Sequence, residues 1–138
     1  MASDITQELR AEVIRRADYR CEYCRIHEED AGFSHEVDHI VSRKHGGTST
    51  ADNLAYACVL CNRYKGSDVA SIHPGTEESV LLFHPRRGRW ADHFRLEGPV
   101  IAAKTNCGAA TVRLLRLNAP ERLAERRLLQ SSARYPRS

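Results

Sequence analysis

The chain has 138 residues, of which 41% are apolar, and a net charge of +3; this size fits one domain, or a small domain with an extension, around a modest core. No stretch approaches the roughly 18 consecutive apolar residues of a membrane span, and the charged N-terminus lacks the apolar core of a signal peptide. We therefore expect a soluble, cytoplasmic protein with no membrane partner.

The first predicted element is an amphipathic helix over residues 5–17. Its apolar side chains recur at the spacing of one helical face: Ile5, Leu9, Val13 and Ile14. Ser3 or Asp4 is expected to cap its N-terminus. The helix leads directly into a pair of cysteines.

Four of the five cysteines form two Cys-x2-Cys pairs: Cys21, Cys24, Cys58 and Cys61. In a chain without a secretory signal, this pattern predicts four thiolates around a structural Zn²⁺, because each two-residue spacer lets a tight turn present both sulfurs to one ion. The 33 residues between the pairs exceed the spacing of a minimal zinc ribbon, which predicts a folded insert. The remaining Cys107 is expected to be buried as a small apolar residue.

The insert is predicted to contain a strand, a loop and a helix. Residues 35–41 have strand composition, and residues 43–53 contain a Gly-Gly turn and a polar loop. Apolar character resumes at residues 54–60. A short helix is expected to begin after Cys61 and to break near Gly66.

After a turn-rich seam at residues 72–79, three strands are predicted, at residues 80–85, 93–98 and 99–105. They would form a small β-meander with the basic sequence RRGR at its tip. Two helices follow within residues 108–130, and Pro120 lies in the first turn of the second. We expect an α+β fold in two segments, residues 1–70 and 71–138, packed as one body.

Charge is distributed unevenly along the chain. Residues 1–85 contain 9 Lys and Arg against 14 Asp and Glu, whereas residues 86–138 contain 12 against 4. A basic half of this size suits a phosphate backbone, because each neutralised phosphate releases counterions. A solvated charged surface is the alternative.

The segment with both cysteine pairs also contains an Asp-His pair, an Asn-Leu pair about fourteen residues later, and the run CNRYK. In this order the residues resemble the HNH endonuclease motif, and the continuation at residues 83–94 and 108–118 is similar to small stand-alone bacterial HNH proteins. The resemblance implies a ββα-metal, treble-clef-like core with structural zinc. In such a core a hairpin and a helix hold one divalent cation against the scissile phosphate.

The resemblance assigns His39 as the general base, since an imidazole with a reference pKa of about 6.5 can accept a proton from water at cellular pH. Asp38 matches the first ligand of the catalytic ion, and hard oxygen ligands suit Mg²⁺ or Mn²⁺. Asn53 matches the asparagine whose amide bridges backbone groups and holds the base strand. Asn62 stands where the family usually has histidine, which implies an H-N-N variant that favours Mg²⁺ or Mn²⁺ over Zn²⁺ or Ni²⁺.

Adjacent strand residues point to opposite faces, so Asp38 and His39 cannot both reach one ion from an ideal strand. The site therefore needs a bulge or a strand end. Singly, each residue also has an ordinary interpretation: an Asp-His pair is usually on the surface, and Asn53 could be only a turn or helix cap.

Basic side chains around the predicted site are candidates for contacts with the nucleic-acid backbone. They are Arg43, Lys44, Arg63, Lys65, Arg86, Arg87 and Arg89. Lys65, three residues after Asn62, would meet a phosphate or lie solvated at a helix end. His35 and His45 are further candidates for phosphate contacts, whereas His93 is expected to pack with Trp90 and Phe94.

The function that the sequence favours is a metal-dependent HNH endonuclease acting on DNA, and one such site predicts nicking of one strand per event. The alternative is a catalytically inactive, zinc-dependent nucleic-acid-binding module. A restriction or homing enzyme is disfavoured by the short C-terminal part. Whether the chain is a monomer or a homodimer stays open.

Overall fold

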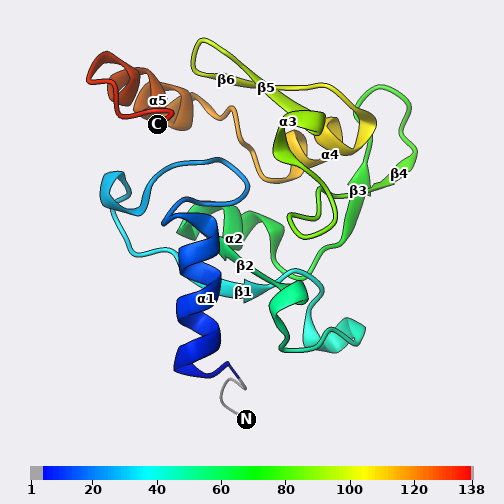
Figure 1. Ribbon diagram of the computed structural model, residues 1–138. Helices are drawn as coiled ribbons and strands as arrows, with labels where there is room; N and C mark the ends of the chain where they lie inside the picture. The colour runs from blue at the N-terminus through cyan, green and yellow to red at the C-terminus, as the bar shows by residue number, and fades with distance from the viewer. Residues whose placement is uncertain (1–4, 138) are drawn as a thin grey trace.

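The computed structural model describes residues 5–137 (Figure 1). In chain order the elements are α1 (Gln7–Ala17), β1 (Glu36–His39), β2 (Leu54–Ala57), α2 (Val59–Lys65), β3 (Ala70–Ile72), β4 (Ser79–Leu81), α3 (Trp90–His93), β5 (Phe94–Glu97), β6 (Val100–Ala103), α4 (Asn106–Leu114) and α5 (Pro120–Ser131). Short 3₁₀ helices lie at Glu28–Asp30, Arg43–His45 and Ala51–Asn53. The predicted α+β class is confirmed.

Helix α1 packs on the β1–β2 hairpin through its predicted apolar stripe. Val13 and Ala17 are buried in one cluster with Val37, Leu54 and Tyr56 of the two strands. The expected caps, Ser3 and Asp4, lie outside the described residues. The N-cap is Thr6, whose side chain accepts a hydrogen bond from the Leu9 amide at 3.1 Å.

The β1–β2 hairpin is antiparallel, with Glu36 opposite Ala57 and His39 opposite Leu54. Val37 faces α1, and because successive side chains alternate, Glu36 and Asp38 lie on the other face. Helix α2 contacts β1, and its Asn62 is hydrogen-bonded to Glu36. The hairpin is therefore placed between α1 and α2.

Helix α2 begins at Val59, earlier than the predicted start after Cys61. The reason is a sulfur cap: the Cys58 thiol accepts a hydrogen bond from the Cys61 amide at 3.4 Å. The helix ends at Lys65, and Gly66 follows at φ +52°, in agreement with the predicted break.

The predicted β-meander is wrong. Within residues 5–137 the strands form three separate two-stranded sheets, in which β4 pairs with β3 and β5 pairs with β6. Beyond Leu81 the chain leaves its sheet, and the Phe83 amide donates to the Thr111 hydroxyl of α4 at 2.9 Å instead of to a strand. The basic sequence at residues 86–89 consequently lies in a turn before α3, away from any hairpin tip.

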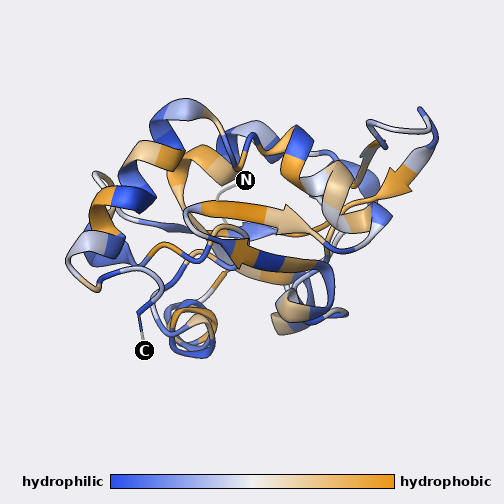
Figure 2. Cartoon of the chain, turned by 90° about the horizontal axis from the view of Figure 1, so that it is seen from above, coloured by the Kyte–Doolittle hydropathy of each residue, from blue (hydrophilic) through white to orange (hydrophobic). Residues whose placement is uncertain are grey.

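One apolar core joins the two predicted segments. Tyr23, Ile26 and Ile40 are buried in the same cluster as side chains from residues 71–138: Phe83, Phe94, Ile101, Leu115 and Leu117. Figure 2 shows hydrophobic residues concentrated on the central strands and hydrophilic residues on the outer helix faces. None of the helices in residues 5–137 is long and apolar enough to cross a membrane.

Candidate active site and zinc centre

The two cysteine pairs converge as predicted. The Sγ atoms of Cys21, Cys24, Cys58 and Cys61 all lie within 4.8 Å of one another, and all four residues are buried. Among residues 5–137 this is the only such group of three or more His, Cys, Asp or Glu side chains. Four convergent thiols with no open position are the donor set of a structural zinc site.

Local structure brings each pair into position. The first pair lies in a tight turn after α1, where the Cys21 thiol accepts from the amides of Tyr23 and Cys24, each at 3.4 Å. The second pair occupies the N-terminus of α2. Burial raises the pKa of the Cys21 and Cys61 thiols, and a divalent cation reverses that tendency because coordinated thiols lose their protons.

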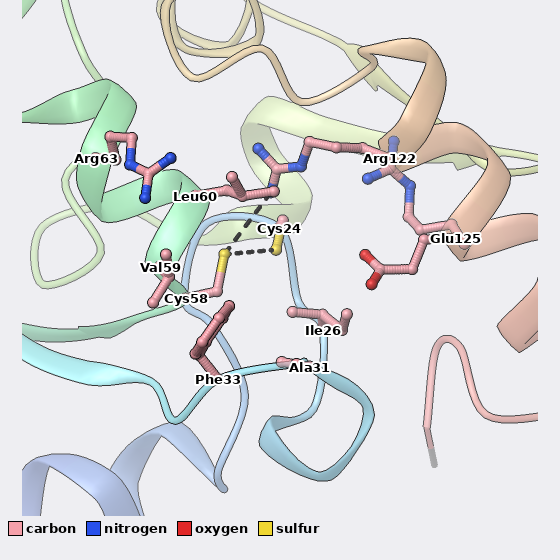
Figure 3. Close-up of a pocket in the computed structure, with 12 residues that line it drawn as sticks. Cys24, Ile26, Ala31, Phe33, Cys58, Val59, Leu60, Arg63, Arg122 and Glu125 are labelled. Atoms are coloured by element: carbon pink, nitrogen blue, oxygen red, sulfur yellow. Dashed lines mark hydrogen bonds between the residues drawn. The ribbon is translucent and has the colours of Figure 1, made fainter.

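Arg122 on α5 contacts this cluster, which the sequence did not indicate. One of its terminal nitrogens donates to Cys61 Sγ at 3.2 Å and to Cys58 Sγ at 3.8 Å, and the other donates to the Leu115 carbonyl at 2.9 Å. Burial opposes its charge, but the charges of Cys61 and Cys24 outweigh burial and raise the pKa of Arg122. In Figure 3 its guanidinium reaches over Cys58 from the opposite side of a hollow bordered by α2. The C-terminal helix thus supplies a positive charge to the thiolates.

Asn53 is 8% exposed and holds the loop between β1 and β2. Its Oδ1 accepts from the Val41 amide at 3.0 Å, and its Nδ2 donates to the carbonyls of Val41 at 2.9 Å and Thr48 at 2.8 Å. The amide therefore joins the backbone just after β1 to the far side of the loop. It is placed to orient the end of β1.

His39 is the last residue of β1 and is half-buried. Its Nε2 lies 2.8 Å from the Ser49 hydroxyl of the same loop. The strand end that the sequence analysis called for is present, because β1 ends at His39, and the register of the hairpin contains no bulge.

Asp38 shares a strand face with Glu36, and α2 lies across that face. Asn62 Nδ2 donates to Glu36 Oε2 at 2.7 Å, which leaves the Asn62 carboxamide oxygen as an acceptor. Glu36 was missed by the sequence analysis, although its two-residue spacing from Asp38 places both carboxylates on one face. Two or three oxygen donors from two elements suit Mg²⁺ or Mn²⁺, which commonly retain water and bind substrate phosphate.

With this geometry established, comparison with known families gives a match. The family model described as HNH endonuclease matches residues 21–68. Over this segment the chain is similar to HNH endonucleases, and residues 21–68 are called the HNH domain below. It spans both cysteine pairs and the candidate site residues Asp38, His39 and Asn62. A nuclease-type family implies a nucleic-acid substrate, and no curated protein or solved structure matches the chain.

Lys65 of the HNH domain is buried, with only 4% of its surface exposed. Its Nζ donates to the Ile40 carbonyl at 2.7 Å, one residue beyond β1. Burial lowers the pKa of Lys65, and the nearby charges of Asp38 and Asp68 oppose that shift. This lysine ties the end of α2 to the end of β1 and is not solvated at a helix end.

The other predicted basic residues divide by burial. Arg86 forms an ion pair with Glu22 of the first knuckle, and only 12% of its side chain is exposed. The remaining arginines and lysine are exposed on the surface: Arg43, Lys44, Arg63, Arg87 and Arg89. His45 is also exposed, whereas His35 is buried with Nε2 3.0 Å from the Ile26 carbonyl.

Two remaining predictions concern residues of the C-terminal segment. His93 contacts the rings of Phe83 and Phe94, with centroids 5.5 and 6.4 Å apart, and Trp90 packs on Phe94. The thiol of Cys107 is half-buried and outside the cysteine cluster.

Proposed function

We propose that the protein is a metal-dependent endonuclease that hydrolyses phosphodiester bonds of DNA through its HNH domain. The observation that supports this most directly is the Asn53 amide, which makes three hydrogen bonds across the loop and so fixes the backbone just after His39. A nucleic-acid-binding module would gain nothing from positioning an imidazole in this way.

In the proposed reaction His39 accepts the proton of the attacking water. If Nε2–H donates to the Ser49 hydroxyl 2.8 Å away, Nδ1 carries the lone pair and is the basic nitrogen. Ser49 then fixes both the tautomer and the ring orientation.

Asp38 and Asn62 would hold the catalytic ion, Mg²⁺ or Mn²⁺. When bound, this ion stabilises negative charge on the phosphate oxygens and on the leaving oxygen. Glu36 acts as a positioning residue: because it accepts from Asn62 Nδ2, it directs the Asn62 carboxamide oxygen away from itself. Its own charge also favours a divalent cation at this edge.

The zinc centre would hold the knuckles and α2 in register, without a part in the chemistry. The backbone of the DNA would be positioned by the exposed basic side chains, Arg43, Lys44, Arg63, Arg87 and Arg89. Arg86 and Lys65 are left out of this surface, because each is bonded to a protein partner and little of either side chain is exposed.

The test is conversion of supercoiled plasmid by the purified chain with Mg²⁺, Mn²⁺ or a chelator. We expect open-circle product that requires metal, since one site cuts one strand per event. His39→Ala should reduce the rate by about 10²–10⁴-fold, the usual contribution of a general base. His73→Ala, in the β3–β4 loop, is the matched control and should leave the rate unchanged.

Undiminished cleavage by His39→Ala would contradict the proposed mechanism. Absence of conversion, together with a retained mobility shift of the DNA, would instead support the catalytically inactive binding module. Linear product would indicate a dimer or two successive events.

A further inference from the structure

A pocket of about 550 Å³ lies between the HNH domain and the C-terminal segment. One wall comes from the HNH domain and includes Ile40 and Val41, the two residues that follow His39, together with His45. The facing wall includes Leu81, His84 and Arg87. The C-terminal segment therefore completes a pocket beside the loop that orients the proposed base.

The lining of this pocket is apolar and rich in nitrogen donors. Phe83 is among the apolar lining residues, and no Asp or Glu within residues 5–137 lines the pocket. Lys65 also lines it, but its ammonium group is occupied by the Ile40 carbonyl. Such a lining suits a flat, largely apolar group that has hydrogen-bond acceptors and is joined to a negative charge.

Two side chains at this pocket are available to a ligand: one is an exposed leucine and the other is an arginine without an ion pair among the described residues. Leu81, the last residue of β4, is 69% exposed, and Figure 2 shows the strand of this projecting hairpin in the hydrophobic colour. Arg87 is exposed and forms no ion pair within residues 5–137. An apolar surface beside a free guanidinium matches a base attached to its phosphate.

His84 provides a further polar group. Its Nδ1 accepts from the Arg86 amide at 3.2 Å, so Nε2 is the nitrogen left for a ligand. Burial, aided by Arg87, lowers the pKa of His84, and a neutral imidazole with an acceptor on Nδ1 offers a donor at Nε2.

We propose that this pocket binds one unpaired nucleotide of the nucleic-acid substrate, with the base against Leu81 and the phosphate at Arg87 and His45. This inference rests on the proposed function and extends it to the class of substrate. A base in an uninterrupted duplex is stacked and paired and cannot enter such a pocket without being extruded. The enzyme should therefore prefer DNA with a single-stranded gap or overhang.

The experiment measures binding of the full chain with His39→Ala, so that no cleavage occurs, in the presence of Mg²⁺. Two probes are compared by fluorescence anisotropy: a blunt DNA duplex, and the same duplex with a short single-stranded gap that contains 2-aminopurine. Leu81→Ser and Arg87→Ala are introduced separately. Exposed residues of α5 supply the matched controls, Leu128→Ser and Arg127→Ala.

We expect each pocket variant to weaken binding of the gapped probe by about tenfold, the order expected for the loss of one apolar or one charged contact, and binding of the blunt duplex by less than about twofold. The controls should change neither, and the 2-aminopurine signal on binding should be lost in Leu81→Ser. The proposal would be overturned if a pocket variant lost the same affinity for both probes, or if it lost no affinity for the gapped probe. Because both pocket residues are exposed, a thermal melt identifies any variant that is misfolded, and the other variant then decides.

Failure here is distinguishable from failure of the proposed function. If the wild-type chain nicks plasmid in a His39-dependent way but the variants do not discriminate between the probes, only the pocket is wrong. If discrimination is found and nicking is not, the catalytic proposal fails and the nucleotide pocket stands.

Discussion

The cysteine cluster and the candidate site residues Asp38, His39 and Asn62 lie in one HNH domain, yet they differ in burial and in ligand type. The four clustered cysteines are at most 6% exposed and provide sulfurs, whereas the three candidate site residues are half-buried and provide oxygens and an imidazole. A closed tetrahedral set stabilises a fold, and an open set leaves positions for substrate. The comparison separates the residues that hold the domain together from those proposed to act on DNA.

Neighbours in α2 show how closely the two regions are joined. Cys61 is fully buried and points to the cluster, while the next residue, Asn62, reaches Glu36 on the exposed edge. Successive helical residues point about 100° apart, so one short helix can serve both regions. Loss of the cysteine cluster should therefore abolish the candidate site on β1 and α2. Loss of that site should leave the cysteine cluster intact.

The largest effect is expected from removing a zinc ligand. Cys61→Ser should unfold the domain, because apparent zinc-binding free energies of about 10–16 kcal/mol in small domains are folding free energy. Circular dichroism and bound zinc per chain measure the effect, with Cys107→Ser as the matched control outside the cluster. A folded Cys61→Ser chain that retains zinc would contradict the structural role of the cluster.

A smaller effect is expected from Arg122→Met, which retains much of the apolar stem but removes the charge that faces the thiolates. Zinc affinity should fall by about 10–100-fold, the usual range for a group that bonds to metal ligands. Competition with a chromophoric chelator measures this. Arg127→Met, on the exposed side of the same helix, should have no effect, and an equal effect would show that helix charge alone matters.

The smallest effect is expected at the exposed edge. Glu36→Ala should raise the Mn²⁺ concentration needed for half-maximal nicking by about tenfold, because Asn62 loses the acceptor that orients it. Glu36→Gln retains an acceptor and should show a smaller shift. Neither change should alter the melting temperature or the zinc content, and a fall in either would assign Glu36 to the fold instead of to the site.

Several features were predictable because their cause is local. The spacing of the cysteines, the stripe of α1 and the position of Pro120 each depend on residues within a turn or two. The meander failed because strand pairing depends on distant partners: residues 70–72 were not predicted as a strand, although they pair with β4. The placement of Lys65, Arg86 and Arg122 was likewise hidden, since a long basic side chain has the same sequence signature whether it ends in solvent or on a buried acceptor.

By itself, the sequence predicted the convergence of the four cysteines, the similarity to the HNH family and the mixed class of the fold. It also supplied Asp38, His39, Asn53 and Asn62 as candidate site residues. Only the tertiary structure decided that α5 supplies a charge to the cysteines, that Glu36 holds Asn62, and that the C-terminal segment completes a pocket beside the loop after β1. The reason for this difference is the separation in sequence between the residues that make each feature. Ligand spacing and helical faces are properties of short segments, whereas a buried charge or a pocket wall exists only where segments far apart in the chain meet.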